Sequence, residues 1–234
     1  MKTPAAVRLS AMYRRQLAQH ATFKDEAGWR VADLYTSADG EAAAARRGVG
    51  LHDASATGKL GVRGGDLEPL VTALTGREPP PVGRASRVEI HGAAALLCRL
   101  AADELLLLSR PGDLASVESM VAKTAGTVGC AHVTDLTSAF AAVDVIGPRV
   151  IALLERLLPL DLSEAAAPPL AVVQGEVARA HAIVLRWDGR LPAFRIMVAR
   201  EHGEFVWDSL RDAGHDLGLT LVGAAARARL NGEA

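Results

Sequence analysis

The segment GKLGVRGGDLEPLVTALTG, residues 58–76, decides the fold class. Residues 59–63 alternate between polar and apolar side chains, which predicts a strand with one buried face. Asp66 then stands where the N-cap of a helix accepts backbone N–H groups, and Gly76 stands where a helix ends in the left-handed conformation. The segment therefore predicts a strand that is followed at once by a helix over residues 66–75.

The elements that follow complete a known supersecondary pattern. Three prolines in the segment 77–83 lack the N–H donors that a helix or a central strand needs, so this segment is a loop. Beyond it the hydrophobic pattern predicts strands at 87–91 and 104–109, a further apolar run at 93–100, a helix at 113–125 and a strand at 128–135. The order β-α-β-β-α-β is that of a ferredoxin-like unit.

The same order recurs in the second half of the chain. The patterns predict a strand at 141–146, a helix opened by Gly147 and Pro148, strands at 177–187 and 194–198, a helix at 201–213 and a strand at 219–222. Gly64 recurs as Gly147 at an offset of 83 residues, and the junction at Arg110 recurs at Arg200 at an offset of 90. These offsets predict an α+β fold of two duplicated ferredoxin-like units, and a chance match of common βα units is the alternative.

The remaining segments complete one domain over residues 1–234. Residues 5–19 predict an amphipathic N-terminal helix that is docked on the body, residues 20–40 predict mostly loop, and residues 41–47 predict a short helix. The expected parts are the N-terminal helix and loop 1–51, a first unit 52–136, a second unit 137–225 and the start of a C-terminal helix at 226–234.

Composition excludes several classes of protein. The 26 Lys and Arg residues balance 27 Asp and Glu residues in 234, and half of the residues are hydrophobic, which excludes global disorder and argues against nucleic-acid binding. No apolar run approaches the roughly 18 residues of a membrane span, and the first 20 residues have no apolar core of a signal peptide. We therefore expect a cytoplasmic protein that binds neither a membrane nor nucleic acid. Cys98 and Cys130 match no metal or redox spacing, and we expect both to be reduced.

General catalytic motifs do not appear in the sequence. It contains no nucleophile elbow, zinc-protease motif, phosphate-binding loop or dinucleotide fingerprint, and its seven His residues have no metal-ligand spacing, so no metal site is expected. Trp187 precedes an Asp-Gly turn signal. Such a Trp is usually a packing anchor, and in a pocket it stacks on a flat heterocycle.

One segment has a familiar form. DASATGK, residues 53–59, is preceded by GVGLH and followed by LGVRGGD, and it resembles the signature of the glycine-cleavage T-protein (aminomethyltransferase) family, which includes the T-protein-like half of the sarcosine oxidase α subunit. Further segments resemble the family in the same order, at residues 133–157, 194–214 and 222–234, and the opening region does so through Trp29 and Tyr35. The resemblance implies duplicated ferredoxin-like units and a tetrahydrofolate cofactor.

The resemblance also implies a folate-binding cleft, with no catalytic residue assigned. The residues that would line it are Tyr35, Asp53, Ser55, Arg99, Trp187 and Arg227. Of these, Arg227 matches the family's Arg that is associated with the carboxylate tail of folate. The resemblance also implies that the family's carboxylate on its DDL segment is missing, since the Asp positions of that segment fall on Ala93 and Ala94. It implies that the pterin-binding Glu is missing too, since that position falls on Leu191.

Two hypotheses about function follow. The first is a tetrahydrofolate-dependent transferase of aminomethyl or methyl groups, in which orientation of the reactants carries much of the rate. The second is a degenerate, non-catalytic T-protein-like subunit of a larger complex, with an amine oxidase or a separate barrel-domain chain as partner. Because methyl groups hold no proton, we expect little or no turnover by the isolated chain, unless Asp103 or Asp188 replaces the lost carboxylates.

Overall fold

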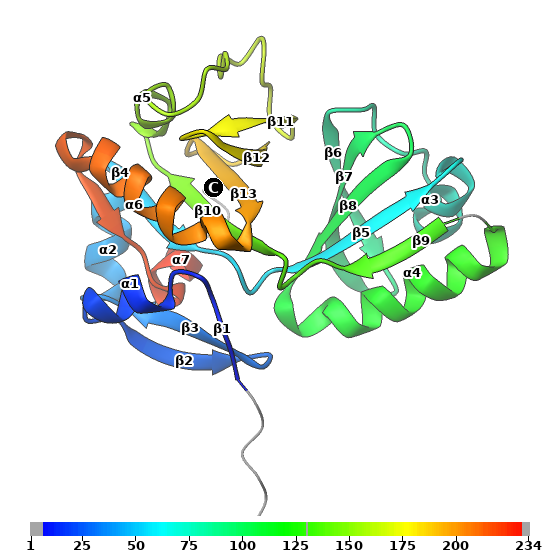
Figure 1. The fold of residues 1–234 in the computed structure, drawn as a ribbon, viewed down its shortest axis with the longest axis horizontal. Coiled ribbons are helices and arrows are strands. Elements are labelled where there is room, and N and C mark those ends of the chain that lie inside the picture. Colours follow the sequence, from blue (N-terminus) through cyan, green and yellow to red (C-terminus); the bar gives the residue numbers. More distant parts are fainter. Residues whose placement is uncertain (1–6, 130, 231–234) are drawn as a thin grey trace, which may run out of the picture. The chain divides into compact units, whose positions relative to one another are not determined.

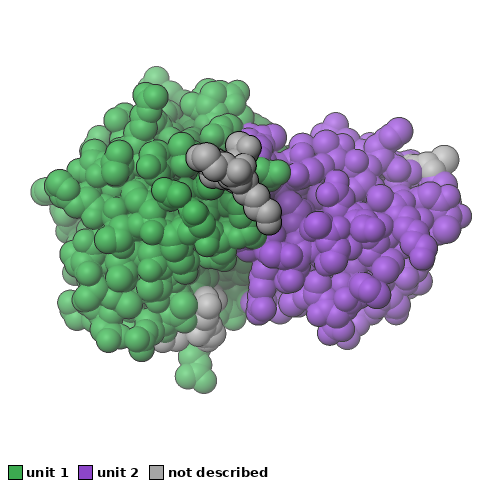
Figure 2. Space-filling view, turned by 90° about the horizontal axis from the view of Figure 1, so that it is seen from below, with its two compact units in different colours: residues 1–56, 140–169, 174–234 green, residues 57–139, 170–173 purple. Residues whose placement is uncertain are grey.

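The computed structural model describes residues 7–129 and 131–230, which fold as two compact units. One unit comprises residues 1–56, 140–169 and 174–234, and the other comprises residues 57–139 and 170–173 (Figure 2). We call them the larger and the smaller unit. The α+β class is confirmed. Among the described residues no helix is long and apolar enough to cross a membrane.

The smaller unit contains the segment that predicted the fold. β5 (Gly58–Gly64) is followed by α3 (Glu68–Thr75), as predicted, and Gly76 ends the helix at φ +69°. The carboxylate of Asp66 accepts the N–H of Glu68, so the helix begins two residues later than expected. The other elements are β6 (Arg84–Ile90), β7 (Ala93–Ala101), β8 (Glu104–Ser109), a 3-10 turn (Pro111–Asp113), α4 (Leu114–Val128) and β9 (Ala131–Asp135).

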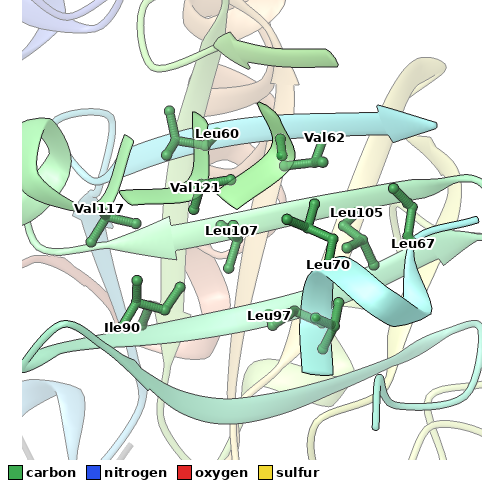
Figure 3. Packing of buried hydrophobic residues seen from close by; sticks show 13 residues of the cluster. Leu60, Val62, Leu67, Leu70, Ile90, Leu97, Leu105, Leu107, Val117 and Val121 are labelled. Atoms are coloured by element: carbon green, nitrogen blue, oxygen red, sulfur yellow. The ribbon is translucent and has the colours of Figure 1, made fainter. Parts of the chain in front are cut away.

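The strands of the smaller unit form one sheet in the order β6-β7-β8-β5-β9. All four pairings are antiparallel. α3 and α4 lie on one face of this sheet (Figure 1). The side chains between them and the sheet are hydrocarbon and point toward one another (Figure 3). Each fully buried Leu or Val contributes about 1.5–3 kcal/mol of transfer free energy, so this core alone accounts for the position of both helices.

The larger unit repeats this order of elements. It contains β10 (Phe140–Ile146), α5 (Val150–Leu154), β11 (Val172–Val177), β12 (Ala180–Arg186), β13 (Ala193–Ala199), a 3-10 turn (Arg200–His202), α6 (Gly203–Ala213), a further 3-10 turn (His215–Leu217) and β14 (Leu219–Leu221). Both units therefore read β-α-β-β-β-α-β, and the predicted duplication is confirmed with one more strand in each unit. The sheet order is β11-β12-β13-β10-β4-β14, in which β4 (Val49–Asp53) is inserted from the N-terminal segment.

The N-terminal segment departs from the sequence prediction. The expected helix over residues 5–19 is shorter, since α1 spans Tyr13–Ala18 and follows β1 (Arg8–Leu9). Residues 20–40, predicted to be mostly loop, contain the antiparallel strands β2 (Thr22–Glu26) and β3 (Trp29–Leu34), joined by a turn in which Ala27 and Gly28 both have positive φ. β2 is largely exposed, so it carries no hydrophobic alternation to indicate a strand.

Three other elements also begin or end at residues that differ from the prediction. The alanine-rich helix α2 runs over Ala38–Ala45, because the Ser37 hydroxyl accepts the Gly40 N–H and caps it earlier than expected. The strand predicted at 177–187 begins later, at Ala180 of β12, because Val177 ends β11 and the residues between them form a turn. In that turn Ala178 and Arg179 adopt φ values of +50° and +68° without any glycine to signal it. α5 begins at Val150, two residues after Pro148, and ends by Leu154.

Helices cover both faces of the six-stranded sheet. A Cβ on Gly50 of β4 would lie 2.8 Å from the Ala45 Cβ of α2. A Cβ on Gly203 of α6 would lie 2.7 Å from the Ala141 Cβ of β10. Since Gly50 pairs with Ile146, and successive residues of a strand point to opposite faces, α2 and α6 cover different faces of β10. We call them the α2 face and the α6 face.

Candidate functional site

A buried ion pair lies on the α2 face. Asp144 of β10 stands directly opposite Arg195 of β13, and its side chain is 1% exposed. The Arg195 guanidinium donates from Nε to Oδ1 at 2.7 Å and from Nη2 to Oδ2 at 2.9 Å. This two-bond arrangement is the strongest way in which an arginine holds a carboxylate.

A second guanidinium approaches the same carboxylate from α7 (Ala224–Arg229). Arg227 Nε lies 3.6 Å from Asp144 Oδ2, and its side chain is 16% exposed. The start of α7 is held by the Glu41 carboxylate, which accepts the N–H of Gly223 at 2.8 Å. Two guanidinium groups, those of Arg195 and Arg227, thus lie beside one buried carboxylate.

His52 of β4 completes the cluster on the other side of Asp144. It stands directly opposite Asp144 in the register, and its Nδ1 lies 2.9 Å from the Val222 carbonyl oxygen. Because a carbonyl oxygen only accepts, Nδ1 carries the proton. Burial lowers the pKa of His52, so the ring is neutral at neutral pH and adds no charge. Burial by itself raises the pKa of Asp144, but the guanidinium groups of Arg195 and Arg227 lower it to about 2.

Trp187 lies beside this cluster, in the connection after β12. The Arg195 guanidinium carbon is 5.0 Å from the centre of the indole ring, within the range of a cation–π contact. The Trp187 Nε1 is buried and has no hydrogen-bond partner among the described residues. An indole N–H without a partner favours a ligand that brings an acceptor. We call Asp144, Arg195, Arg227, His52 and Trp187 the cationic cluster.

The six residues expected in a folate cleft fall in three places. Arg227 and Trp187 meet in the cationic cluster, joined by Arg195. Asp53 follows His52 on β4 and so points to the α6 face, where its carboxylate accepts from Gln16 Nε2 at 2.7 Å and its charge acts on Tyr35. The contact with Gln16 also holds α1 on the larger unit. The sequence predicted an N-terminal helix that is docked on the body in this way.

Ser55 and Arg99 have local partners. The Ser55 hydroxyl is 1% exposed and accepts the Ala142 N–H at 3.1 Å, so it braces the chain after β4. Arg99 lies on β7 of the smaller unit, where its guanidinium donates to the Pro80 carbonyl oxygen at 3.4 Å and lies 3.8 Å from Glu68.

Asp144, Arg195 and His52 were not among the site residues predicted from the sequence. Asp144 and Arg195 are each the lone charge within an apolar strand, AAVDVI and AFRIMV, and such a charge must be paired when it is buried. That signal was available. Cys98 is fully buried, as expected for a small hydrophobic residue, whereas Cys130 lies outside the described residues. Within residues 7–129 and 131–230 no group of His, Cys, Asp and Glu could hold a metal ion.

The structure also places the two sites that the resemblance aligned with family carboxylates, namely the start of β7 and Leu191. Ala93 and Ala94 begin β7 after the turn at His91 and Gly92, and Ala94 is exposed. Leu191 is half-buried and packs against the apolar cluster to which Ile146 and Ala226 belong. Neither position carries a group that could accept a hydrogen bond or hold a proton.

Comparison with known proteins identifies relatives of the whole chain. The family model described as the GCVT N-terminal domain matches residues 12–234. An aminomethyltransferase of Saccharopolyspora erythraea is 29% identical over 224 residues, which cover 92% of this chain and 60% of that protein. Sarcosine oxidase subunit alpha of Corynebacterium sp. strain P-1 is 28% identical and covers 92% of this chain and 25% of that protein. This chain therefore spans about 60% of the length of that aminomethyltransferase.

Solved structures agree on the fold. Aminomethyltransferase T of the glycine cleavage system from Bartonella henselae matches with a TM-score of 0.82 at 18% identity, over 94% of this chain and 61% of that one. A chain of the heterotetrameric sarcosine oxidase from Corynebacterium sp. U-96 matches with a TM-score of 0.64 at 22% identity, over 78% of this chain and 93% of that one. The T-protein fold that the DASATGK segment indicated is thus shown.

Proposed function

Because the chain belongs to the GCVT N-terminal domain family, we propose that it binds a reduced folate and takes part in one-carbon transfer. The observation that carries the proposal is the pair of guanidinium groups of Arg195 and Arg227 beside the buried indole N–H of Trp187. A folate combines a flat, hydrogen-bonding pterin with the carboxylates of its glutamate tail. The cluster offers a cation for a carboxylate and an indole for a heterocycle.

In this proposal the chain's own residues bind and orient the ligand. Arg227 would attract the tail carboxylate, Trp187 would donate through Nε1, and Asp144 would hold Arg195 in place. When bound, tetrahydrofolate would supply the nitrogen that accepts or gives up the one-carbon group. Positioning of that kind accounts for a large part of the rate in such reactions.

A titration calorimetry experiment tests the proposal directly. Wild-type protein should bind tetrahydrofolate, and Arg227→Ala should weaken binding by roughly 10- to 100-fold. The reason is that a hydrogen bond to a charged group contributes about 1.5–3 kcal/mol, at 1.4 kcal/mol per tenfold. Arg63→Ala, an exposed arginine of β5, is the matched control and should leave the affinity unchanged. Wild-type affinity in Arg227→Ala would contradict the placement of the tail.

A second ligand separates the tail from the pterin. Tetrahydropteroate lacks the glutamate, so it should bind wild type and Arg227→Ala alike, whereas Trp187→Phe should weaken both ligands. If Arg227→Ala weakens both ligands equally, the residue maintains the fold of the cluster rather than contacting the tail.

The alternative role is that of a subunit without turnover of its own. It is favoured by Ala94 and Leu191, which stand where the family carries carboxylates, and by the sarcosine oxidase chain of which 93% is covered by this fold. We expect the isolated chain to show no aminomethyl transfer to tetrahydrofolate, and to co-elute with a flavin-dependent amine oxidase or barrel-domain chain encoded beside it. Turnover by the isolated chain that is abolished by Asp103→Ala or Asp188→Ala would overturn this alternative.

A further inference from the structure

A cavity lies within the larger unit, lined by residues outside the cationic cluster. Its volume is about 700 Å³, and its walls come from α2, from the end of α6 and from the edge strand β14. The lining residues include Tyr35, Arg211, Asp212, Leu219 and Leu221. None of them belongs to the cationic cluster.

Arg211 supplies a positive charge to this cavity. It lies in the last turn of α6, is half-buried, and forms no ion pair or side-chain hydrogen bond with any residue in the described parts of the chain. A half-buried guanidinium that has lost some of its water favours a carboxylate. The arginine therefore defines one end of a ligand.

Negative charges prevent the cavity from favouring a plain anion. Asp212 lines the cavity, is exposed, and does not pair with Arg211. Glu41 is 2% exposed and accepts the N–H groups of Tyr35 and Thr36, each at 2.7 Å, so its charge is fixed within the wall. One cation and two carboxylates favour a ligand that carries both signs of charge.

Tyr35 adds a hydrogen-bonding group without a partner. Its hydroxyl oxygen is buried and makes no hydrogen bond within the described residues, although the side chain lines the cavity. Burial, with the charges of Asp53 and Glu41, raises the pKa of this hydroxyl, so it keeps its proton and can donate. A buried hydroxyl left without an acceptor is unfavourable, and a ligand oxygen would relieve that state.

We propose that this cavity binds a free α-amino acid with an apolar side chain. The carboxylate lies on Arg211 and the Tyr35 hydroxyl, the ammonium group faces Asp212, and the side chain lies against Leu219 and Leu221. The site is separate from the folate site and does not depend on it.

Three probes of one shape test the charge requirement by calorimetry on the full chain. Leucine carries both charges, 4-methylpentanoate lacks the ammonium group, and 3-methylbutylamine lacks the carboxylate. Leucine should bind, 4-methylpentanoate should bind at least tenfold more weakly, and 3-methylbutylamine should give no heat. No saturable binding of leucine up to 10 mM, or equal binding of all three, would overturn the proposal and leave a water-filled groove.

Two variants locate the binding. Arg211→Ala should abolish leucine binding, and Arg63→Ala should not alter it. Tyr35→Phe removes only the unpartnered hydroxyl, so it should weaken leucine binding several-fold without lowering the melting temperature of the free protein. Leucine affinity that is unchanged in Arg211→Ala refutes the site. Leucine should bind with the same affinity in the presence and in the absence of saturating tetrahydrofolate, because the two sites are separate. Competition between the two ligands would contradict a separate leucine site.

Discussion

The smaller and the larger unit share one order of strands and helices but carry different residues at equivalent positions of their first strands. In the smaller unit Gly61 stands three residues before the glycine that ends β5 and pairs with Leu106 of β8. In the larger unit Asp144 stands three residues before Gly147 and pairs with Arg195 of β13. A glycine and a leucine thus take the place of a buried ion pair.

This difference shows that the shared order of strands and helices does not require the ion pair. A buried ion pair loses most of its attraction to the cost of leaving water, and hydrocarbon of the same volume is often as stable. The smaller unit builds the same order of strands and helices with the uncharged Gly61 and Leu106 at these two positions. The charges of the larger unit therefore point to a role in binding rather than in folding.

Removal of the Asp144 carboxylate should have the largest effect. Asp144→Ala leaves the Arg195 guanidinium, whose side chain is 8% exposed, without its counter-ion. Breaking a buried pair in this way costs about 3–5 kcal/mol of unfolding free energy. Urea denaturation measures the loss, and a midpoint equal to that of wild type would show that water already reaches Arg195.

The double variant Asp144→Leu/Arg195→Met is the matched control. It gives the larger unit an apolar pair like that of the smaller unit, so it should recover most of the stability that Asp144→Ala loses. If the double variant is as unstable as the single one, the fold of the larger unit requires the ion pair. The inference from the smaller unit would then be wrong.

Acid should remove part of the stability of the larger unit. The folded pKa of Asp144, about 2, lies below its ordinary value of 3.8, so the folded chain binds this proton less tightly than the unfolded chain. The stabilisation is present above about pH 4 and is lost as the pH falls toward 2, and it amounts to about 2 kcal/mol. Between pH 5 and 2.5 the urea midpoint of wild type should therefore fall relative to the midpoint of the double variant. A difference that does not change with pH would contradict the lowered pKa.

His52 should produce a smaller slope at milder pH. Burial lowers its pKa below the ordinary 6.5, so stability is fully present above pH 6.5 and decreases as the pH falls below it. One proton changes the unfolding free energy by at most about 1.4 kcal/mol per pH unit. His52→Gln should flatten the stability profile between pH 7 and 5, and an unchanged slope would assign that titration to another group.

Much of the fold could be predicted because its signals are local. The apolar alternation of β5, the glycine at the end of α3 and the recurrence of Gly64 as Gly147 all follow from backbone geometry and hydrophobic period. β2 was missed because an exposed strand has no apolar face, and the turn at Ala178 and Arg179 was missed because neither residue is a usual turn former.

The candidate site was predictable only in part. Arg227 and Trp187 were named through the family resemblance and share one cluster, whereas Asp53 points to the opposite face of its sheet. Strand register brings Asp144 together with Arg195, which lies 51 residues away, and no local pattern reports such a pairing. The lone charge in an apolar strand gives only the need for a partner.

The smallest effect is expected at an ion pair with the same strand geometry as Asp144 and Arg195. Arg63 of β5 stands directly opposite Glu104 of β8, and its Nη2 lies 2.7 Å from Oε1. The Arg63 side chain is 71% exposed, so water and salt screen the attraction and the ordering of both side chains offsets it. Arg63→Ala should leave the urea midpoint within experimental error of wild type at 0.15 M salt. A clear loss of stability would mean that position in the sheet, and not burial, determines the effect of removing a charge, and the contrast with Asp144→Ala would then lose its basis.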